Sequence, residues 1–301
     1  MKITEKQEYL RIEGVKDFNS DQIFDCGQCF RWERDEDGLY TGAACGKAAA
    51  VDYDAENETL KIYGADREDF ESIWRRYFDL DRDYASIKEI LSQRDEVIRD
   101  AIAYGSGIRI LNQEKWETLI SFIISQNNNI PRIKKCINSL AENFGQKVGE
   151  IRGKTYFGLP SPERLASLTV EDLAVCRLGY RAGYLIETAR KVAEEGIDSL
   201  ERLGSSHVSR QEAFEALRGY RGVGPKVANC ILLFSMGKFD SFPIDVWVRK
   251  VMNRLYGIEE GKVKDMEVFA EKTFGMYGGI AQQYLFYYIT HSKEMLNCKI
   301  K

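Results

Sequence analysis

Residues 218–230, RGYRGVGPKVANC, contain the most informative pattern in the second half of the chain. It joins a helix-like segment, residues 211–220, to an apolar helical segment, residues 226–237. Gly222 and Gly224 permit the tight backbone turn between them. The pattern is that of a helix-hairpin-helix, in which free N–H groups at the start of the second helix can hold a phosphate oxygen without reading a base sequence.

Lys226 stands where a helix least favours a cation, directly after Pro225 in the first helical turn. The positive end of the helix dipole and apolar neighbours both disfavour an ammonium, so we expect part of this side chain to be a free amine, which is a nucleophile. Asp245, 19 residues later, opens another helix and is held ionised there. Together these two residues suit the cleavage of a glycosidic bond between a sugar and a base. Positive charge develops on the sugar as this bond breaks, and a nearby carboxylate can stabilise it. A solvated turn lysine and an ordinary helix cap are the structural alternatives.

The remainder of the chain divides by periodicity. Apolar residues alternate in residues 9–14 and 48–64, and AENE within the second run predicts a hairpin turn. From about Asp66 the period becomes 3.6, which predicts helices for the rest of the chain. We therefore expect an α+β fold. An N-terminal antiparallel β-sheet domain with flanking helices (1–100) would pack on an α-helical helix-hairpin-helix core (101–301).

The net charge of −4 conceals an uneven distribution. The first 100 residues carry 15 basic and 25 acidic side chains, whereas the remaining residues carry 28 and 22. A basic helical part is compatible with a polyanionic partner such as DNA. No stretch approaches the roughly 20 apolar residues of a membrane span, and the start lacks the apolar core of a signal peptide. We expect no membrane association and a cytoplasmic protein, nucleoid-associated if the source is prokaryotic.

The seven cysteines are scattered and odd in number, which argues against a disulfide framework. Cys26 and Cys29 form a single C-x-x-C pair. No second pair accompanies it, and neither His207 nor His291 lies at zinc-finger spacing. We therefore expect buried, reduced thiols and predict neither a metal site nor a cofactor.

With these residues in view, the sequence resembles the helix-hairpin-helix DNA glycosylases with a Gly-Pro-Asp segment, and within them the 8-oxoguanine DNA glycosylases. The resemblance spans nearly the whole chain and implies a bifunctional enzyme. Such an enzyme extrudes 8-oxoguanine from duplex DNA, attacks the sugar through Lys226 and cleaves the strand by β-elimination from a Schiff base. It also implies lesion-containing double-stranded DNA as the partner, and we expect a monomer. Seven segments carry the resemblance in the family's order: GQCFRW (27–32), YFDLD (77–81), SQNNNIPRI (125–133), LGYRAGY (178–184), GVGPKVANC (222–230), PIDV (243–246) and AQQYLF (281–286).

The resemblance assigns Lys226 and Asp245 to catalysis and four further residues to the flipped base. Gly27 matches the position whose carbonyl accepts a hydrogen bond from N7–H of the oxidised base, where normal guanine has an acceptor instead. The other three matching residues are Gln282 for the Watson–Crick edge, Phe286 for stacking and Cys230 for the far wall of the pocket. From the residues alone, a strand turn, a core aromatic and a buried thiol are simpler interpretations.

A second set matches residues that contact the DNA backbone or the base left unpaired. Its arginine and asparagine donors suit the acceptors of cytosine, so we predict a preference for cytosine opposite the lesion. Without the resemblance, NNNIPR is an ordinary polar helix end. The set comprises Asn127, Arg132, Tyr180 and Arg181 for the partner strand, with Gly222 and Gly224 for the phosphate.

The chain departs from the family pattern at a few positions. Trp247 stands where the family often has histidine, and Ile289 where it often has aspartate, which puts the outer shell of the pocket in doubt. Pro131 is also unexpected and is predicted to shift Arg132.

Three other readings compete with this one, and the cysteines and Lys226 argue against the first two. Endonuclease III and adenine glycosylase relatives close with an iron–sulfur cluster held by four C-terminal cysteines, and only Cys298 is available there. Alkylbase glycosylases typically lack the hairpin lysine. A non-catalytic helix-hairpin-helix DNA-binding protein is the alternative from another functional class.

Overall fold

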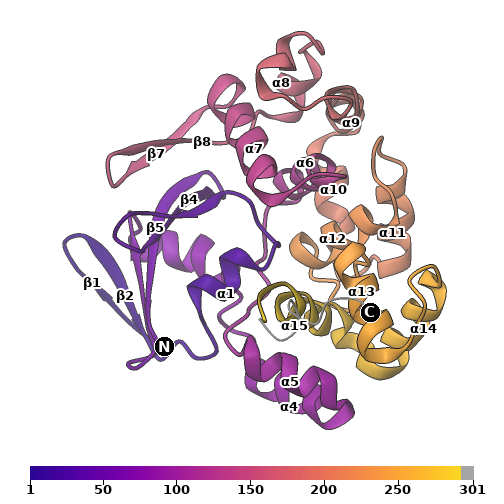
Figure 1. Ribbon diagram of the computed structural model, residues 1–301. Coiled ribbons are helices and arrows are strands. Elements are labelled where there is room, and N and C mark those ends of the chain that lie inside the picture. Colours follow the sequence, from indigo (N-terminus) through magenta and orange to yellow (C-terminus); the bar gives the residue numbers. More distant parts are fainter. Residues whose placement is uncertain (293–301) are drawn as a thin grey trace.

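The computed structural model describes residues 1–292 and contains an antiparallel sheet packed beside a helical core (Figure 1). The predicted α+β fold is confirmed. The main sheet has the strand order β1-β2-β6-β5-β4-β3, and a two-stranded sheet follows later in the chain. The strands are β1 (Lys2–Glu5), β2 (Tyr9–Glu13), β3 (Trp32–Arg34), β4 (Tyr40–Ala44), β5 (Lys47–Asp54), β6 (Thr59–Tyr63), β7 (Lys147–Ile151) and β8 (Lys154–Phe157).

The alternating apolar residues determine how β2 pairs with β6. Leu10 lies opposite Ile62 and Ile12 opposite Leu60, and all four side chains are fully buried. A register slip of one residue would turn this set toward the other face, so burial specifies the pairing. The turn predicted at AENE is confirmed between β5 and β6, where the Asp54 carboxylate accepts backbone hydrogen bonds from the turn.

Helices make up most of the chain after the sheet. Among residues 1–292, none of them is long and apolar enough to cross a bilayer. The helical segments, with η marking π- and 3₁₀-turns, are α1 (Ser20–Asp25), α2 (Arg67–Asp69), η1 (Phe70–Trp74), α3 (Arg75–Tyr77), α4 (Tyr84–Arg94), α5 (Glu96–Tyr104), α6 (Lys115–Ser125), α7 (Ile130–Phe144), α8 (Pro162–Ala166), η2 (Asp172–Cys176), α9 (Arg181–Glu195), α10 (Ile197–Leu203), α11 (Arg210–Arg218), α12 (Pro225–Ser235), α13 (Val246–Tyr256), α14 (Val263–Phe274), η3 (Gly275–Tyr277) and α15 (Gly278–His291).

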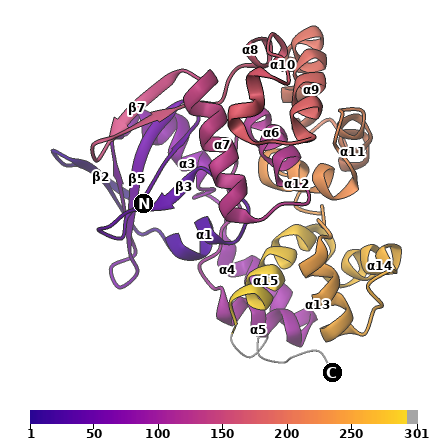
Figure 2. The ribbon, with the colours of Figure 1, turned by 45° about the horizontal axis from the view of Figure 1, so that its top comes forward.

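The prediction that the chain is helical throughout after Asp66 is wrong for the β7–β8 hairpin. Its two-residue loop, Arg152 and Gly153, has positive φ at both positions, which matches the twist of the flanking strands. The hairpin packs against β5 and extends the sheet side of the molecule (Figure 2). The Tyr156 hydroxyl donates to Thr41 Oγ1 at 2.8 Å. The hairpin is therefore held by tertiary contacts with residues far away in the sequence.

Helices α4 and α5 belong by packing to the helical part. Their apolar residues, including Tyr84, Leu91 and Ile98, lie in the same core as α12 and α15. Both views place α5 beside α15, and the two helices are in contact (Figures 1 and 2). Residues 84–104 thus pack with the core, while the division predicted at residue 100 stays a prediction.

Gln28 ties the loop after α1 to the segment that leads into α6. Its amide Nε2 donates to the carbonyl oxygen of Arg109 at 2.8 Å, and its Oε1 accepts from the N–H of Leu111 at 2.9 Å. Gln113 Nε2 in turn donates to the Gln28 carbonyl at 2.7 Å. Since Gln28 is completely buried, each lost bond would leave an unsatisfied polar group. The loop that begins with Gly27 is therefore fixed relative to the helical core, and α1 lies between the sheet and α15 (Figures 1 and 2).

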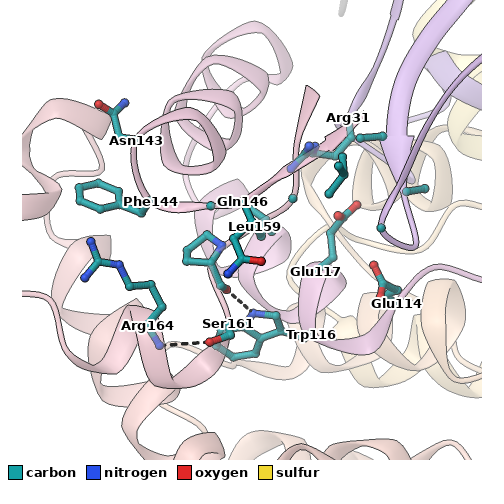
Figure 3. A pocket seen from close by; sticks show the side chains of 17 residues that line it. Arg31, Glu114, Trp116, Glu117, Asn143, Phe144, Gln146, Leu159, Ser161 and Arg164 are labelled. Atoms are coloured by element: carbon teal, nitrogen blue, oxygen red, sulfur yellow. Dashed lines mark hydrogen bonds between the residues drawn. The ribbon is translucent and has the colours of Figure 1, made fainter. Parts of the chain in front are cut away.

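A cavity of about 620 Å³ lies where the sheet, α6, the end of α7 and the loop after β8 meet (Figure 3). Glu117 on α6 points into it. Burial raises the pKa of Glu117 to about 7; Arg31 acts to lower that pKa, and Glu114 adds to the rise. The charged residues that line the cavity include Arg31, Glu114, Glu117 and Arg164.

Glu117→Gln is expected to stabilise the protein above pH 7 and to have little effect near pH 4. A carboxyl whose pKa is raised on folding binds a proton more tightly in the folded state, so stability falls as pH rises from about 4.5 to about 7. The neutral amide has no such pH dependence, so above pH 7 the free energy of unfolding is expected to rise by up to about 3 kcal/mol for a pKa shift of this size. Urea unfolding at several pH values measures it, with the exposed Glu8→Gln as control. A pH-independent difference between variant and parent would contradict the prediction.

Candidate active site

The hairpin between α11 and α12 has the geometry that its glycines predict. Gly222 has φ +81°, and a Cβ there would lie 2.8 Å from Cδ2 of Tyr184, so both the conformation and the space require glycine. Pro225 begins α12, and Gly224 precedes it without a side-chain cap. The N–H groups of the first turn therefore have no partner within the helix. Lys226, the second residue of α12, projects from this end.

Lys226 lines a small pocket that collects residues from widely separated parts of the chain. The pocket measures about 50 Å³. All six residues predicted for catalysis or base binding are among the residues that line it. The lining consists of Cys26, Gly27, Phe122, Lys226, Cys230, Phe234, Pro243, Asp245, Gln282, Gln283 and Phe286.

The surroundings of Lys226 are apolar on one side and polar on the other. Its Nζ lies 5.0 Å from the centroid of the Phe122 ring, and the half-buried side chain hydrogen-bonds the Cys230 thiol one turn along α12. Burial raises the pKa of Cys230 to about 11. The charge of Lys226 acts to lower this pKa, and the charge of Asp245 acts to raise it. Cys230 is therefore a neutral thiol at physiological pH, and the lining of the pocket contains one amine, Lys226, and one carboxylate, Asp245.

Asp245 is held by the start of α13. Its Oδ1 accepts a hydrogen bond from the N–H of Val248 at 2.8 Å, which is the capping geometry predicted for it. Asp245 can cap α13 and line the pocket at the same time, because its half-buried side chain is among the lining residues, as is Pro243. The start of α13 therefore fixes the position of the carboxylate.

Gly27 and Phe286 both line the pocket and lie against each other. Gly27 has φ +76°, and a Cβ built on it would lie 3.3 Å from Cε1 of Phe286. The ring thus rests against the backbone whose carbonyl is predicted to contact the base. On the preceding turn of α15, Gln282 is buried and accepts a hydrogen bond from Gln283 Nε2 at 3.0 Å.

The residues predicted to read the partner strand lie together near the hairpin, with different exposures. Tyr180 is 53% exposed, and Asn127 and Arg132 are also exposed, Asn127 with φ +48°. Arg181 is only 4% exposed, and its guanidinium donates to the carbonyl oxygens of Gln126 and Asn127. In this structure Arg181 therefore positions the turn that presents Asn127, and its direct contact with a partner base stays a prediction.

The departures from the family pattern have structural explanations. Trp247 is 40% exposed at the start of α13, with Lys250 Nζ 4.5 Å from its ring centroid, whereas Ile289 is buried in the core. Pro131 is the second residue of α7, where it fits the first turn, and Asn129 caps that helix by accepting from the N–H of Arg132. Cys298 lies outside the described residues.

Sequence reasoning missed several residues that line the pocket, namely Cys26, Phe122, Phe234, Pro243 and Gln283. Cys26 was considered only as part of a metal motif. Burial raises its pKa to about 12, and its Sγ donates to the carbonyl oxygen of Ile23 at 3.3 Å. The two phenylalanines carry no local signal, because an apolar residue on a buried helix looks the same whether it faces a core or a pocket.

Comparisons with known proteins agree with this geometry. Residues 12–119 match the 8-oxoguanine DNA glycosylase N-terminal domain, and residues 120–274 match the HhH-GPD superfamily base excision DNA repair protein. An N-glycosylase/DNA lyase of Saccharomyces cerevisiae is 35% identical over 80% of this chain and 69% of its own length.

Solved structures are also similar over almost the whole chain. MBOgg1 in complex with a low-affinity DNA ligand has a TM-score of 0.90 and 46% identity, covering 95% of this chain and 97% of that one. The 8-oxoguanine glycosylase/lyase of Clostridium acetobutylicum, in complex with double-stranded DNA containing cytosine opposite 8-oxoguanine, has a TM-score of 0.90 and 42% identity, covering 96% and 98%. These matches favour an enzyme over a non-catalytic hairpin protein. The chain belongs to the 8-oxoguanine DNA glycosylase family, within the helix-hairpin-helix superfamily of base excision DNA repair proteins.

Proposed function

We propose that this enzyme excises 8-oxoguanine from duplex DNA, cleaves the strand through a Schiff base at Lys226, and prefers cytosine opposite the lesion. The observation that carries the proposal is the single pocket that unites Lys226, Asp245, Gly27, Gln282 and Phe286. Support also comes from the printed descriptions of relatives as N-glycosylase/DNA lyase and 8-oxoguanine glycosylase/lyase. The protein would act as a monomer in the cytoplasm.

In the proposed reaction, the Lys226 amine attacks C1′ of the deoxyribose. The bond between C1′ and the base breaks, and the base leaves with the electron pair and takes up a proton. Asp245 stabilises the positive charge that builds on the sugar as this bond lengthens. The nitrogen, positively charged after the attack, gives one proton to the departing base. The ring oxygen O4′ then leaves C1′ with its electron pair and takes up a proton from solvent, which leaves a protonated Schiff base. Removal of a proton from C2′ then expels the 3′ phosphate, which is the β-elimination that opens the strand.

The damaged base would have to reshape the pocket on entry. The Phe286 ring rests against Gly27, where a base has to enter to reach the Gly27 carbonyl. We infer that the ring swings away from Gly27 and covers the base, which exposes the Gly27 carbonyl to N7–H of the lesion.

The DNA backbone would lie along the hairpin. The N–H groups of the first turn of α12 have no partner within the helix and no side-chain cap, and such groups can hold a phosphate oxygen. Gln126 lines the same groove as Gly222 and Gly224, and its carbonyl is bound by Arg181. The hairpin and the exposed partner-strand residues are therefore parts of one continuous surface.

Excision from four duplexes, with 8-oxoguanine opposite each normal base, tests the proposal. We expect the highest single-turnover rate opposite cytosine. Arg132→Ala is expected to reduce that preference by about tenfold, as for the loss of one charged hydrogen bond. The matched control is Lys135→Ala, an exposed cation on the same helix that should retain the preference. Equal wild-type rates opposite all four bases would contradict the cytosine preference, and no excision from any duplex would contradict the proposed function.

A further inference from the structure

A second glutamine lines the base pocket beside Gln282. Gln283 is 3% exposed and its Nε2 donates to Gln282 Oε1 at 3.0 Å, but its own Oε1 has no hydrogen-bond partner among the described residues. Consecutive residues on a helix point about 100° apart. Gln282 and Gln283 nevertheless both line the pocket, so it extends far enough around α15 to include the two adjacent amides.

An unsatisfied acceptor in this position is costly unless a ligand uses it. Leaving a buried acceptor unpaired destabilises a protein, and such groups are rare in native structures. The fold is able to satisfy a buried glutamine completely, since Gln28 has partners for both its oxygen and its nitrogen. Gln283 differs in that its free oxygen belongs to a residue of the base pocket. The missing partner is therefore best supplied by a donor on whatever enters that pocket.

We propose that Gln283 is a specificity residue, whose Oε1 accepts a hydrogen bond from the exocyclic 2-amino group of the damaged guanine. This inference rests on the proposed function. Gln282 Oε1 keeps one lone pair after accepting from Gln283, and that lone pair is available to N1–H of the base. Two adjacent acceptors then face the two adjacent donors of a guanine edge. A purine that lacks the 2-amino group leaves Gln283 unpaired.

A pair of substrates that differ only in this amino group tests the inference. Duplexes carry 8-oxoguanine or 8-oxohypoxanthine opposite cytosine, and single-turnover excision rates are measured for each. The wild type is expected to favour 8-oxoguanine by on the order of tenfold or more. Gln283→Met, which has similar length and no acceptor, is expected to bring this ratio close to one. Gln93→Met, an exposed substitution of the same type, should leave the ratio unchanged.

The remaining outcomes are equally decisive. If Gln283→Met slows both substrates by the same factor, Gln283 only orients Gln282 and the inference is overturned. It is also overturned if the wild type shows no preference between the two substrates. Gln283→Glu retains an acceptor oxygen and is expected to keep the preference, which would show that the loss in Gln283→Met comes from the missing acceptor. If the methionine variant fails to fold, Gln283→Leu also lacks an acceptor and takes its place, and an unchanged ratio in that variant overturns the inference. Absence of excision of 8-oxoguanine by the wild type would instead refute the proposed function.

Discussion

Lys226→Gln is expected to eliminate covalent trapping of the protein on 8-oxoguanine DNA by borohydride. The adduct forms by reduction of a Schiff base, which requires a primary amine at the sugar, and an amide nitrogen is not a nucleophile of this kind. Lys226 is the amine that lines the base pocket. Strand cleavage by β-elimination should disappear with the adduct, because both depend on the same imine.

Binding should distinguish loss of chemistry from loss of fold. Glutamine fits the half-buried position in the first turn of α12, so affinity for the lesion duplex is expected to stay within about threefold of the wild type, a change below 1 kcal/mol. Lys264→Gln, an exposed lysine on α14, should form the adduct normally. A covalent adduct that persists in Lys226→Gln would identify a different nucleophile.

Asp245→Asn is expected to lower the single-turnover excision rate by about a hundredfold or more, the scale for removing one electrostatic contact to a transition state. Substrate affinity should change little, because the carboxylate charge matters mainly as positive charge develops on the sugar. Asparagine is also a good helix cap, so the bond to the Val248 N–H can be retained. Rapid-quench excision and equilibrium binding measure the two effects.

A second substitution separates the catalytic and capping roles of Asp245. Asp245→Ala removes both, and loss of the cap is expected to lower the free energy of unfolding by about 1 kcal/mol. The asparagine variant should therefore be the more stable of the two, with a similar loss of rate. An unchanged excision rate in Asp245→Asn would show that the carboxylate only caps α13.

The prediction from sequence succeeded where the structural signal is local. The turn at Gly222 and Gly224, the cap at Asp245 and the AENE turn are each specified by a few consecutive residues, and the structure contains all of them. The residues predicted to bind the base came from the resemblance to a family. From their own neighbours, a strand turn was an equal interpretation for Gly27, and a core aromatic was the favoured one for Phe286.

Prediction from the sequence failed where contacts between distant segments determine the local structure. Periodicity after Asp66 indicated helices only, and β7–β8 is held by contacts such as Tyr156 with Thr41. The hydrogen bonds from the Arg181 guanidinium to the carbonyl oxygens of Gln126 and Asn127 likewise carry no signal in the sequence, and its contact with DNA stays a prediction. The sequence of α15 shows two adjacent glutamines without indicating which of their polar atoms lacks a partner.

The helix-hairpin-helix, the antiparallel pairing and the placement of an amine and a carboxylate at two helix starts follow from the sequence alone, because backbone propensity and capping act over a few residues. The folded arrangement was needed to show that these two groups share a pocket with Gly27, and that Gln283 lines it with an acceptor that has no partner among residues 1–292. Burial and hydrogen-bond satisfaction depend on which distant atoms approach one another, and that information is absent from any short segment.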